Sequence, residues 1–282
     1  DHRDLHSFPT RRSSDLALPQ APDFERMDMI QTSLLMDHKI AQALDRIKAF
    51  EPPEGYYVAF SGGKDSIVVL DLVRKAGVKH DTHMNLTSVD PPELIKYVKQ
   101  YYPDVQRHRP KENMWQLIER KMYPPTMKVR YCCEALKEGG GAGRFVITGV
   151  RWAESQKRAR RTLTATCTRN GETKRYLRPI IDWSDNEVWE YININNLPYC
   201  SLYDEGFTRI GCIGCPFAGK HRSRDFQRWP RFEKLWRRAM HKAAARRREI
   251  GWVRSKYETH ASWTTDGDLM WKYWMDDSKH GT

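Results

Sequence analysis

Residues 56–73 read YYVAFSGGKDSIVVLDLV, and this stretch decides the fold. Tyr56–Phe60 is a short apolar run typical of a buried strand. From Ile67 to Val73 the apolar side chains have the spacing of a buried helix, which we expect to end near Gly77. The pattern therefore predicts a strand that passes through a tight glycine loop directly into a helix.

The loop between them has the residue types that bind phosphate groups: Ser61, Gly62, Gly63, Lys64, Asp65 and Ser66. Glycines permit positive φ and leave backbone N–H groups open, and the helix start adds free N–H groups and a positive dipole end. Lys64 brings a full charge. The spacing does not fit the Walker pattern, which needs four residues between its glycines. A plain Gly-Gly helix cap is the alternative, but the order of strand, loop and apolar helix favours phosphate binding.

Strand-like and helix-like segments alternate along the rest of the chain. Further helices are expected after Pro91-Pro92, after Asn113, and after Ser184, which begins a capping-box pattern with Glu187. Further strands are expected at 82–86, 105–108, 145–150 and 177–181. The alternation predicts an α/β fold, a Rossmann-like parallel sheet with helices on both faces.

The net charge of +12 is concentrated near the end of the sequence. Residues 216–256 hold fourteen lysines and arginines against three acidic residues, and the apolar positions after Pro230 have helical spacing. With its many tryptophans, the segment 216–282 is expected to be a basic, Trp-rich helical C-terminal lobe. The charge indicates either a solvated helix face or a surface that binds phosphates, with a nucleic acid as the candidate partner.

Four of the six cysteines form two pairs, Cys132-Cys133 and the C-x-x-C pair Cys212/Cys215. With no signal peptide, a reducing cytoplasm is expected, so metal binding or redox chemistry outranks disulfides. Two pairs favour one shared metal site, with zinc and a [4Fe–4S] cluster as the candidates. Adjacent cysteines are awkward zinc ligands because consecutive side chains tend to diverge.

Several motifs resemble the phosphoadenosine phosphosulfate reductase family, within the PP-loop adenine nucleotide alpha-hydrolase-like superfamily. They are the loop 61–66, residues 149–158 (GVRWAESQKR), 178–183 (RPIIDW), 197–199 (LPY) and 211–215 (GCIGC). The resemblance covers about residues 40–220. It implies that the loop holds the phosphate or sulfate end of ATP or an adenylyl sulfate, and that Arg151 and Arg158 contact that anionic group. Mg²⁺ is a further candidate ion.

The resemblance also bears on the cysteines. Assimilatory adenylyl-sulfate reductases, and the related DNA phosphorothioation sulfurtransferases, carry a [4Fe–4S] cluster. By this likeness Cys132, Cys133, Cys212 and Cys215 are expected to bind a cluster rather than zinc. The basic residues Arg130 and Lys137 lie close in sequence.

The reductases use a cysteine near their C-terminus as nucleophile, and no cysteine follows Cys215 in this sequence. Lys64, Asp65 and Cys200 are therefore candidate catalytic residues, with Cys167 a weaker one. We expect an adenine-nucleotide-dependent sulfurtransferase. One alternative is an adenylyl-sulfate reductase with a relocated thiol, which receives electrons from a thioredoxin-like or other electron donor. The other is a non-catalytic binding protein. The oligomeric state stays open.

The sequence also predicts how the chain is divided. Residues 1–16 resemble translated sequencing-adapter read-through, and 17–50 form a helical segment. Residues 51–215 form the nucleotide-binding and iron–sulfur domain, followed by the lobe 216–282. No run of about 18 apolar residues occurs, so no membrane helix is expected.

Overall fold

The computed structural model describes residues 24–169, 171–252 and 264–276. It divides into two compact units, residues 1–38 and 39–282. Of the first unit only the start of α1 is described, and everything below concerns the second. The elements are α1 (Phe24–Ala49), β1 (Tyr56–Ala59), α2 (Lys64–Ala76), β2 (His80–Asn85), α3 (Pro92–Tyr101), β3 (Gln106–His108), α4 (Met114–Lys121), α5 (Tyr131–Leu136), β4 (Phe145–Ile147), η1 (Trp152–Glu154), α6 (Gln156–Ala159), β5 (Thr164–Arg169), β6 (Glu172–Leu177), α7 (Asp185–Ile194), η2 (Ser201–Tyr203), η3 (Pro216–His221), α8 (Arg222–Arg228), α9 (Pro230–Glu249) and α10 (Gly267–Met275).

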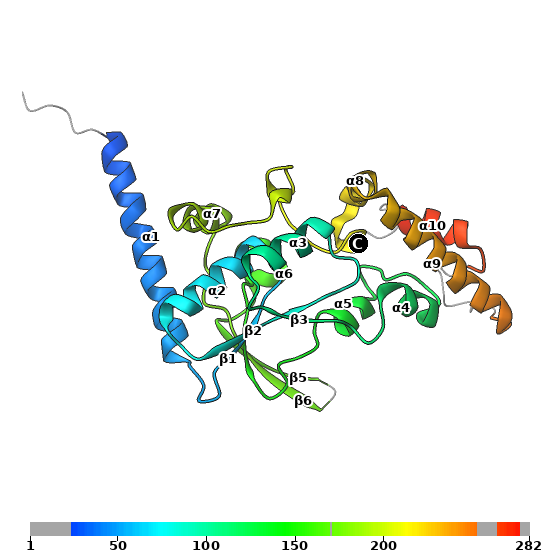
Figure 1. Cartoon of the computed structure of the whole chain (residues 1–282), viewed down its shortest axis with the longest axis horizontal. Helices are drawn as coiled ribbons and strands as arrows, with labels where there is room; N and C mark the ends of the chain where they lie inside the picture. The colour runs from blue at the N-terminus through cyan, green and yellow to red at the C-terminus, as the bar shows by residue number, and fades with distance from the viewer. Residues whose placement is uncertain (1–23, 170, 253–263, 277–282) are drawn as a thin grey trace, which may run out of the picture. The chain divides into compact units, whose positions relative to one another are not determined.

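Six strands form one sheet in the order β3-β2-β1-β4-β6-β5 (Figure 1). All neighbours are parallel except β5 and β6, which pair as an antiparallel hairpin at one edge. The chain thus winds outward from β1 to β3 and then returns to the other side of β1 through β4. This confirms the predicted α/β fold with a mostly parallel sheet and helices around it. A ligand site is expected where the two directions of winding meet, beyond the carboxyl end of β1.

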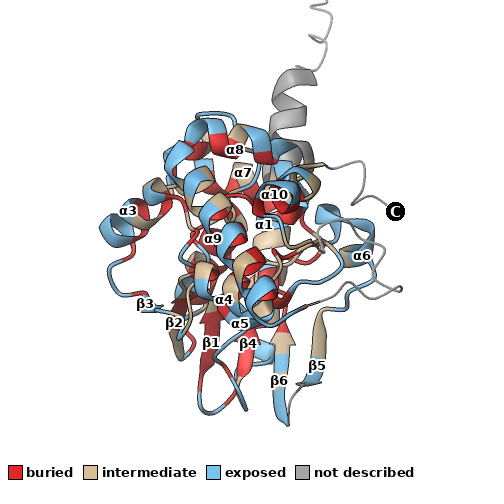
Figure 2. Ribbon diagram, turned by 90° about the vertical axis from the view of Figure 1, so that its right-hand side faces the viewer, coloured by how far each residue is buried: buried red, intermediate tan, exposed pale blue. Residues whose placement is uncertain are grey.

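The predicted passage from strand to loop to helix is confirmed. α2 begins at Lys64, directly after Gly63, and ends at Gly77, which has the left-handed conformation of a helix C-cap. Its apolar side chains are buried, as Figure 2 shows for the interior of this unit. α2 packs beside α7, where the Tyr191 hydroxyl donates to Asp71 at 2.6 Å.

The predicted strand at 177–181 was wrong in its position. The strand ends at Leu177, and the Ile181 amide donates to the Arg178 carbonyl in a turn. Pro179 has no N–H to donate to a neighbouring strand, which explains why pairing stops there. The preceding β5–β6 hairpin was not predicted, because its mainly polar and exposed residues lack the apolar alternation of a half-buried strand.

The C-terminal helices α8, α9 and α10 lie together (Figure 1), held by tryptophans. Trp236 and Trp274 are fully buried and stack with ring centroids 4.6 Å apart. The Trp236 indole N–H donates to the Ile213 carbonyl, and the Trp274 indole N–H donates to the Pro125 carbonyl. This confirms the expected helical character of the C-terminal region, of which Trp263 lies outside the described residues. None of the helices in the described ranges combines the length and apolar character needed to cross a membrane.

Gly62 is the position in the loop where only glycine fits. Its φ is +72°, and a Cβ there would lie 2.7 Å from Leu94 Cδ1 and 2.9 Å from Val98 Cγ2. Gly77 has a similar φ of +70° but open space around it. We expect Gly62→Ala to lower the free energy of unfolding by about 2–4 kcal/mol, and Gly77→Ala by only about 1 kcal/mol. Urea denaturation measures both, and equal losses would contradict the steric explanation.

Candidate functional site

The glycine loop is closed on itself by serine hydroxyls. The Ser66 hydroxyl donates to the Gly63 carbonyl at 2.8 Å and accepts from the Ser61 amide at 3.2 Å. The two hydroxyl oxygens of Ser61 and Ser66 lie 3.2 Å apart. At the start of α2 the Lys64 amide donates to the Tyr203 hydroxyl at 2.9 Å. The loop is therefore held in one conformation before any ligand arrives.

Two cations and two carboxylates form a network behind the loop. Arg151, with 1% of its surface exposed, donates from Nε to Asp65 at 2.6 Å and from Nη2 to Asp185 at 2.5 Å. Its Nη1 donates to the Trp183 carbonyl. Burial raises the pKa of Asp185, but the Arg151 hydrogen bond and the Lys64 charge outweigh it and lower that pKa. Arg151 thus connects β4, α2 and α7. The contact with an anionic ligand that the family resemblance implies for Arg151 stays a prediction.

The Lys64 side chain is also buried, with Nζ 3.5 Å from Asp65 and 3.3 Å from Asp185. Gly149 lies against the same turn of α2, since a Cβ there would be 2.8 Å from the Asp65 carbonyl oxygen. This close approach accounts for the glycine two residues before Arg151. The motif 149–158 therefore positions the end of β4 against the glycine loop.

Arg158 pairs with Glu154 and stands among other guanidinium groups. Burial has the largest effect and lowers the pKa of the Arg158 guanidinium. The charges of Arg209, Arg130 and Arg161 also lower that pKa, whereas the charge of Asp65 raises it. Arginines from three separate segments of the chain therefore act electrostatically on Arg158. A cluster of like charges is a favourable place for a phosphate or sulfate group.

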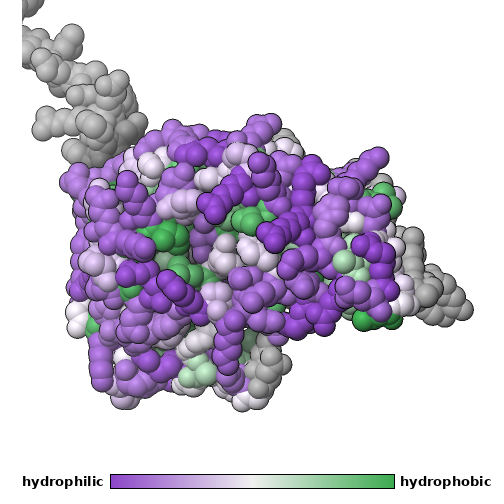
Figure 3. Space-filling view, turned by 45° about the vertical axis from the view of Figure 1, so that its right-hand side comes forward, coloured by the Kyte–Doolittle hydropathy of each residue, from purple (hydrophilic) through white to green (hydrophobic). Residues whose placement is uncertain are grey.

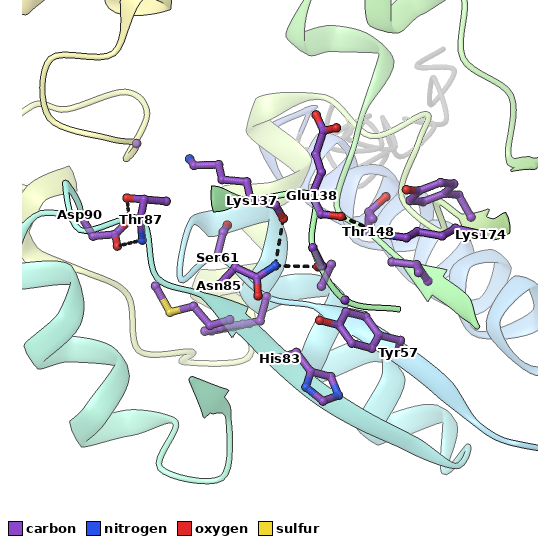
Figure 4. Close-up of a pocket in the computed structure, with 18 of the residues that line it drawn as sticks. Tyr57, Ser61, His83, Asn85, Thr87, Asp90, Lys137, Glu138, Thr148 and Lys174 are labelled. Carbon is purple, nitrogen blue, oxygen red and sulfur yellow. Dashed lines mark hydrogen bonds between the residues drawn. The ribbon is translucent and has the colours of Figure 1, made fainter. Parts of the chain in front are cut away.

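A cavity of about 250 Å³ extends from the glycine loop along the sheet (Figure 4). Its floor consists of side chains on one face of four neighbouring strands: Tyr57, Ala59, His83, Asn85, Val146, Thr148 and Tyr176. Ser61 of the loop lies at one end, and Asp90, Leu94 and Gly211 complete that end. The cavity therefore occupies the expected position at the carboxyl end of the strands.

The segment 137–140 forms another wall and is tied to the sheet. The Asn85 side-chain amide donates to the carbonyls of Lys137 and Gly139, and Lys174 Nζ donates to the Glu138 carbonyl (Figure 4). A Cβ at Gly140 would lie 2.3 Å from the Tyr57 hydroxyl oxygen, so the backbone passes directly over that ring. Sequence reasoning missed these residues, because their only signal was their place at the ends of strands.

The Thr148 hydroxyl is buried and has no hydrogen-bond partner among the described residues, and Thr148 is one of the residues that line this cavity. Its backbone continues β4, and its amide donates to the Leu177 carbonyl. Leaving a buried hydroxyl unpaired costs about 1–3 kcal/mol. A ligand with a polar atom at this point would remove that cost.

His83 forms the edge of the cavity floor. Its ring stacks on Tyr57 at 4.1 Å, and its Nδ1 lies 2.8 Å from Nε2 of the exposed His108. Its Nε2 contacts Asp81, which also pairs with Arg144. The pKa of Asp81 is raised by burial but lowered overall by its hydrogen bonds from Arg144 and His83. The floor is thus fixed from β1 to β3.

The two cysteine pairs come together from opposite ends of the domain. Cys132 and Cys133 lie in the first turn of α5, and Cys212 and Cys215 lie in the loop before η3. The hydrogen bond to Cys133 is the largest effect on the pKa of the Cys132 thiol and raises it, and burial raises it further. The charges of Cys133, Cys212 and Cys215 act in the same direction. Thiols of both pairs therefore influence the ionisation of Cys132. All four are partly buried and free of disulfides.

Lys137 connects this group to the cavity. Burial lowers its pKa, but the charges of Cys212, Asp90 and Cys215 outweigh burial and raise it. Arg130 Nη2 lies 3.6 Å from Cys133 Sγ. The thiols are therefore flanked by two cations, as the sequence suggested. Within the part of the chain that the structure describes, no three His, Cys, Asp or Glu side chains form a group that could hold a metal ion.

The other two cysteines lie apart from the cavity lining. Cys200 is fully buried before η2, and burial raises the pKa of its thiol. Cys167 is exposed on the edge strand β5. Neither arrangement presents an activated thiol to the cavity.

A family model for the phosphoadenosine phosphosulfate reductase domain matches residues 55–218. The chain therefore belongs to the phosphoadenosine phosphosulfate reductase family. An uncharacterised Methanocaldococcus jannaschii protein is 30% identical over 236 residues, which cover 77% of this chain and 45% of that protein. The chain thus spans less than half the length of that relative.

The adenosine 5'-phosphosulfate reductase of Staphylococcus haemolyticus is 29% identical over 189 residues, 62% of this chain and 76% of that enzyme. Among solved structures, the phosphoadenylyl-sulfate reductase of Candida auris is 21% identical, with a TM-score of 0.44 over 71% of this chain and 98% of that one.

Proposed function

We propose that this protein is an adenine-nucleotide-dependent enzyme that binds ATP or an adenylyl sulfate and transfers sulfur, with a nucleic acid as the candidate acceptor. The observation that carries the proposal is the cavity that leads from the closed glycine loop along the carboxyl ends of the strands. A nucleotide fits there with its phosphates at the loop and its nucleoside over the floor. The proposed location is the cytoplasm.

The side chains around the loop have distinct roles in this proposal. Ser61 and Ser66 hold the loop in its closed conformation, and the start of α2 offers its positive dipole end to the phosphates. The gathered arginines, Arg158 and Arg209 among them, offset the negative charge of a pyrophosphate or sulfate group. Such stabilisation favours the step in which the bond to the leaving pyrophosphate breaks. Mg²⁺ is the candidate counter-ion for the phosphates.

The four cysteines support a [4Fe–4S] cluster as the proposed cofactor. Cys132, Cys133, Cys212 and Cys215 provide the four thiolates that such clusters use. Zinc, the alternative, requires its sulfur ligands to converge about 2.3 Å from a single ion. In a cluster each thiolate instead binds its own iron, and the adjacent pair Cys132-Cys133 suits that arrangement better than a single ion. When bound, the cluster would supply one-electron chemistry.

Reduction of an adenylyl sulfate to sulfite is the second candidate, favoured by the similarity to adenosine 5'-phosphosulfate reductases. It needs a relocated nucleophilic thiol, and the burial of Cys200 disfavours that residue. A third candidate is a binding protein without catalysis.

Products distinguish these functions. We expect anaerobically purified protein to release pyrophosphate from ATP, and Lys64→Ala to weaken ATP binding at least tenfold, because the charge beside the loop is lost. Lys75→Ala, at the exposed end of α2, is the control and should leave ATP binding unchanged. The two adenylyl sulfates are tested separately with thioredoxin. Release of sulfite would support the reductase instead, and nucleotide binding without any product would support the binding protein.

Thr148→Val tests the nucleotide's place in the cavity. We expect the variant without ligand to be about 1 kcal/mol more stable, because an unpaired hydroxyl is removed, yet to bind ATP about tenfold more weakly. Thr148→Ser should keep wild-type affinity, and binding of free pyrophosphate should not change. Thermal unfolding and calorimetry measure the two effects. Unchanged ATP affinity in the valine variant would place the nucleoside elsewhere.

Cys212→Ser tests the cofactor. We expect it to lose most of the iron and acid-labile sulfide of the anaerobic protein, because one of four thiolates is missing. Cys167→Ser removes an exposed thiol on β5 and should keep the full content. Iron and sulfide analysis of both variants decides the question. Full iron in the Cys212 variant, or zinc in the wild type, would refute the cluster.

A further inference from the structure

One exposed face of α9 carries a continuous row of cations. The row consists of Arg231, Lys234, Arg238, Lys242 and Arg246, which we call the α9 row. Successive members are three or four residues apart, so their side chains lie one helical turn from each other on the same side. The opposite side of α9, with Trp236, Met240 and Ala243, is buried. The row spans about 22 Å of helix.

Most of this charge is not neutralised within the described part of the chain. Lys242 Nζ lies 3.2 Å from Glu119, whereas no ion pair in that part involves the other four members of the row. Neighbouring arginines behave differently: Arg228 pairs with Glu93 and Glu205, and Arg237 pairs with Glu233. Within the described part of the chain, four cations without an ion pair thus lie along one side of α9.

The first members of the row lie where a helix disfavours them. Arg231 and Lys234 are in the first turns of α9, near the positive end of the helix dipole. A cation there costs about 0.3–1 kcal/mol at low salt. Internal stability therefore does not account for their position, whereas an external polyanion would compensate the cost.

The other side of the same helix contacts the cysteine loop. The Trp236 indole N–H, on the buried side of α9, donates to the Ile213 carbonyl between Cys212 and Cys215. A Cβ at Gly214 would lie 2.8 Å from that indole nitrogen, so the cysteine loop and α9 are in direct contact. The α9 row lies on the opposite, exposed side of the helix.

We propose that the α9 row binds the phosphate backbone of a single nucleic-acid strand, on the exposed side of a helix whose other side contacts the cysteine loop. A row of about 22 Å faces about six phosphates, at one charge per 3.4 Å of strand. This inference rests on the proposed function, for which it provides the acceptor. An anionic membrane fits less well, because membrane-surface helices expose large apolar residues beside their cations. None of the large exposed apolar residues lies within α9, and the face of the molecule drawn in Figure 3 is mainly hydrophilic with separate apolar patches.

The test uses the full chain and fluorescent 20-nucleotide single strands of DNA and of RNA. The variant carries Arg231→Gln, Lys234→Gln and Arg238→Gln, all at exposed positions where glutamine is a good helix former. The matched control carries Lys48→Gln, Lys79→Gln and Lys99→Gln, which remove the same charge from exposed positions outside the C-terminal helices.

We expect the row variant to bind about 100-fold more weakly at 0.1 M salt, with a salt slope lower by about 2, since each phosphate contact contributes about 0.7. The control should stay within a few fold of the wild type. An equal loss in the control would mean diffuse attraction by net charge and would overturn the proposal. Wild-type protein that binds phosphatidylserine vesicles but neither the DNA strand nor the RNA strand would also overturn the proposal.

Nucleotide assays separate this inference from the proposed function. The row variant should bind ATP and release pyrophosphate as the wild type does, because α9 contributes no residue to the cavity. Wild-type protein that releases pyrophosphate but binds no strand would overturn the α9 row alone. Wild-type protein that binds strands but no nucleotide would overturn the proposed function and leave the row intact.

Discussion

The site depends on one buried guanidinium. Arg151 sits at the end of β4 and holds Asp65 at the start of α2 and Asp185 at the start of α7, while also bonding the Trp183 carbonyl. A buried charge is stable only when it is fully paired. The ends of β4, α2 and α7 must therefore be positioned together around Arg151. The glycine loop, the floor strands and the cavity all take their relative positions from this junction. A charged side chain that sequence motifs associate with ligands thus has a structural task in the folded chain.

Much of this fold could be predicted from the sequence, because its signals are local. The apolar run 56–60, the glycines and the helix after them form a continuous pattern, and the capping box at Ser184 fixes where α7 begins. The β5–β6 hairpin could not be predicted in this way, since its stability comes from pairing at the sheet edge rather than from a buried face. The same reason explains why the strand expected at 177–181 was placed too late.

The site was predictable only in part. The loop residues and the two cysteine pairs stand out as motifs, and the structure brings each set together. Thr148 and Asn85 do not stand out, because their importance arises from which strands become neighbours. Whether the cysteines hold a cluster is a matter of chemistry that neither spacing nor burial decides, and it stays a prediction.

The two edge strands of the sheet, one of them the antiparallel β5, determine how readily this chain pairs with strands of other copies. An open parallel sheet has two edges with free N–H and C=O groups, and each edge can template pairing with another chain. Here one edge is β3, only three residues long and fully exposed with polar side chains, and the other is β5, whose sequence TATCTR is mostly polar. Both edges are therefore poor templates for intermolecular strand addition.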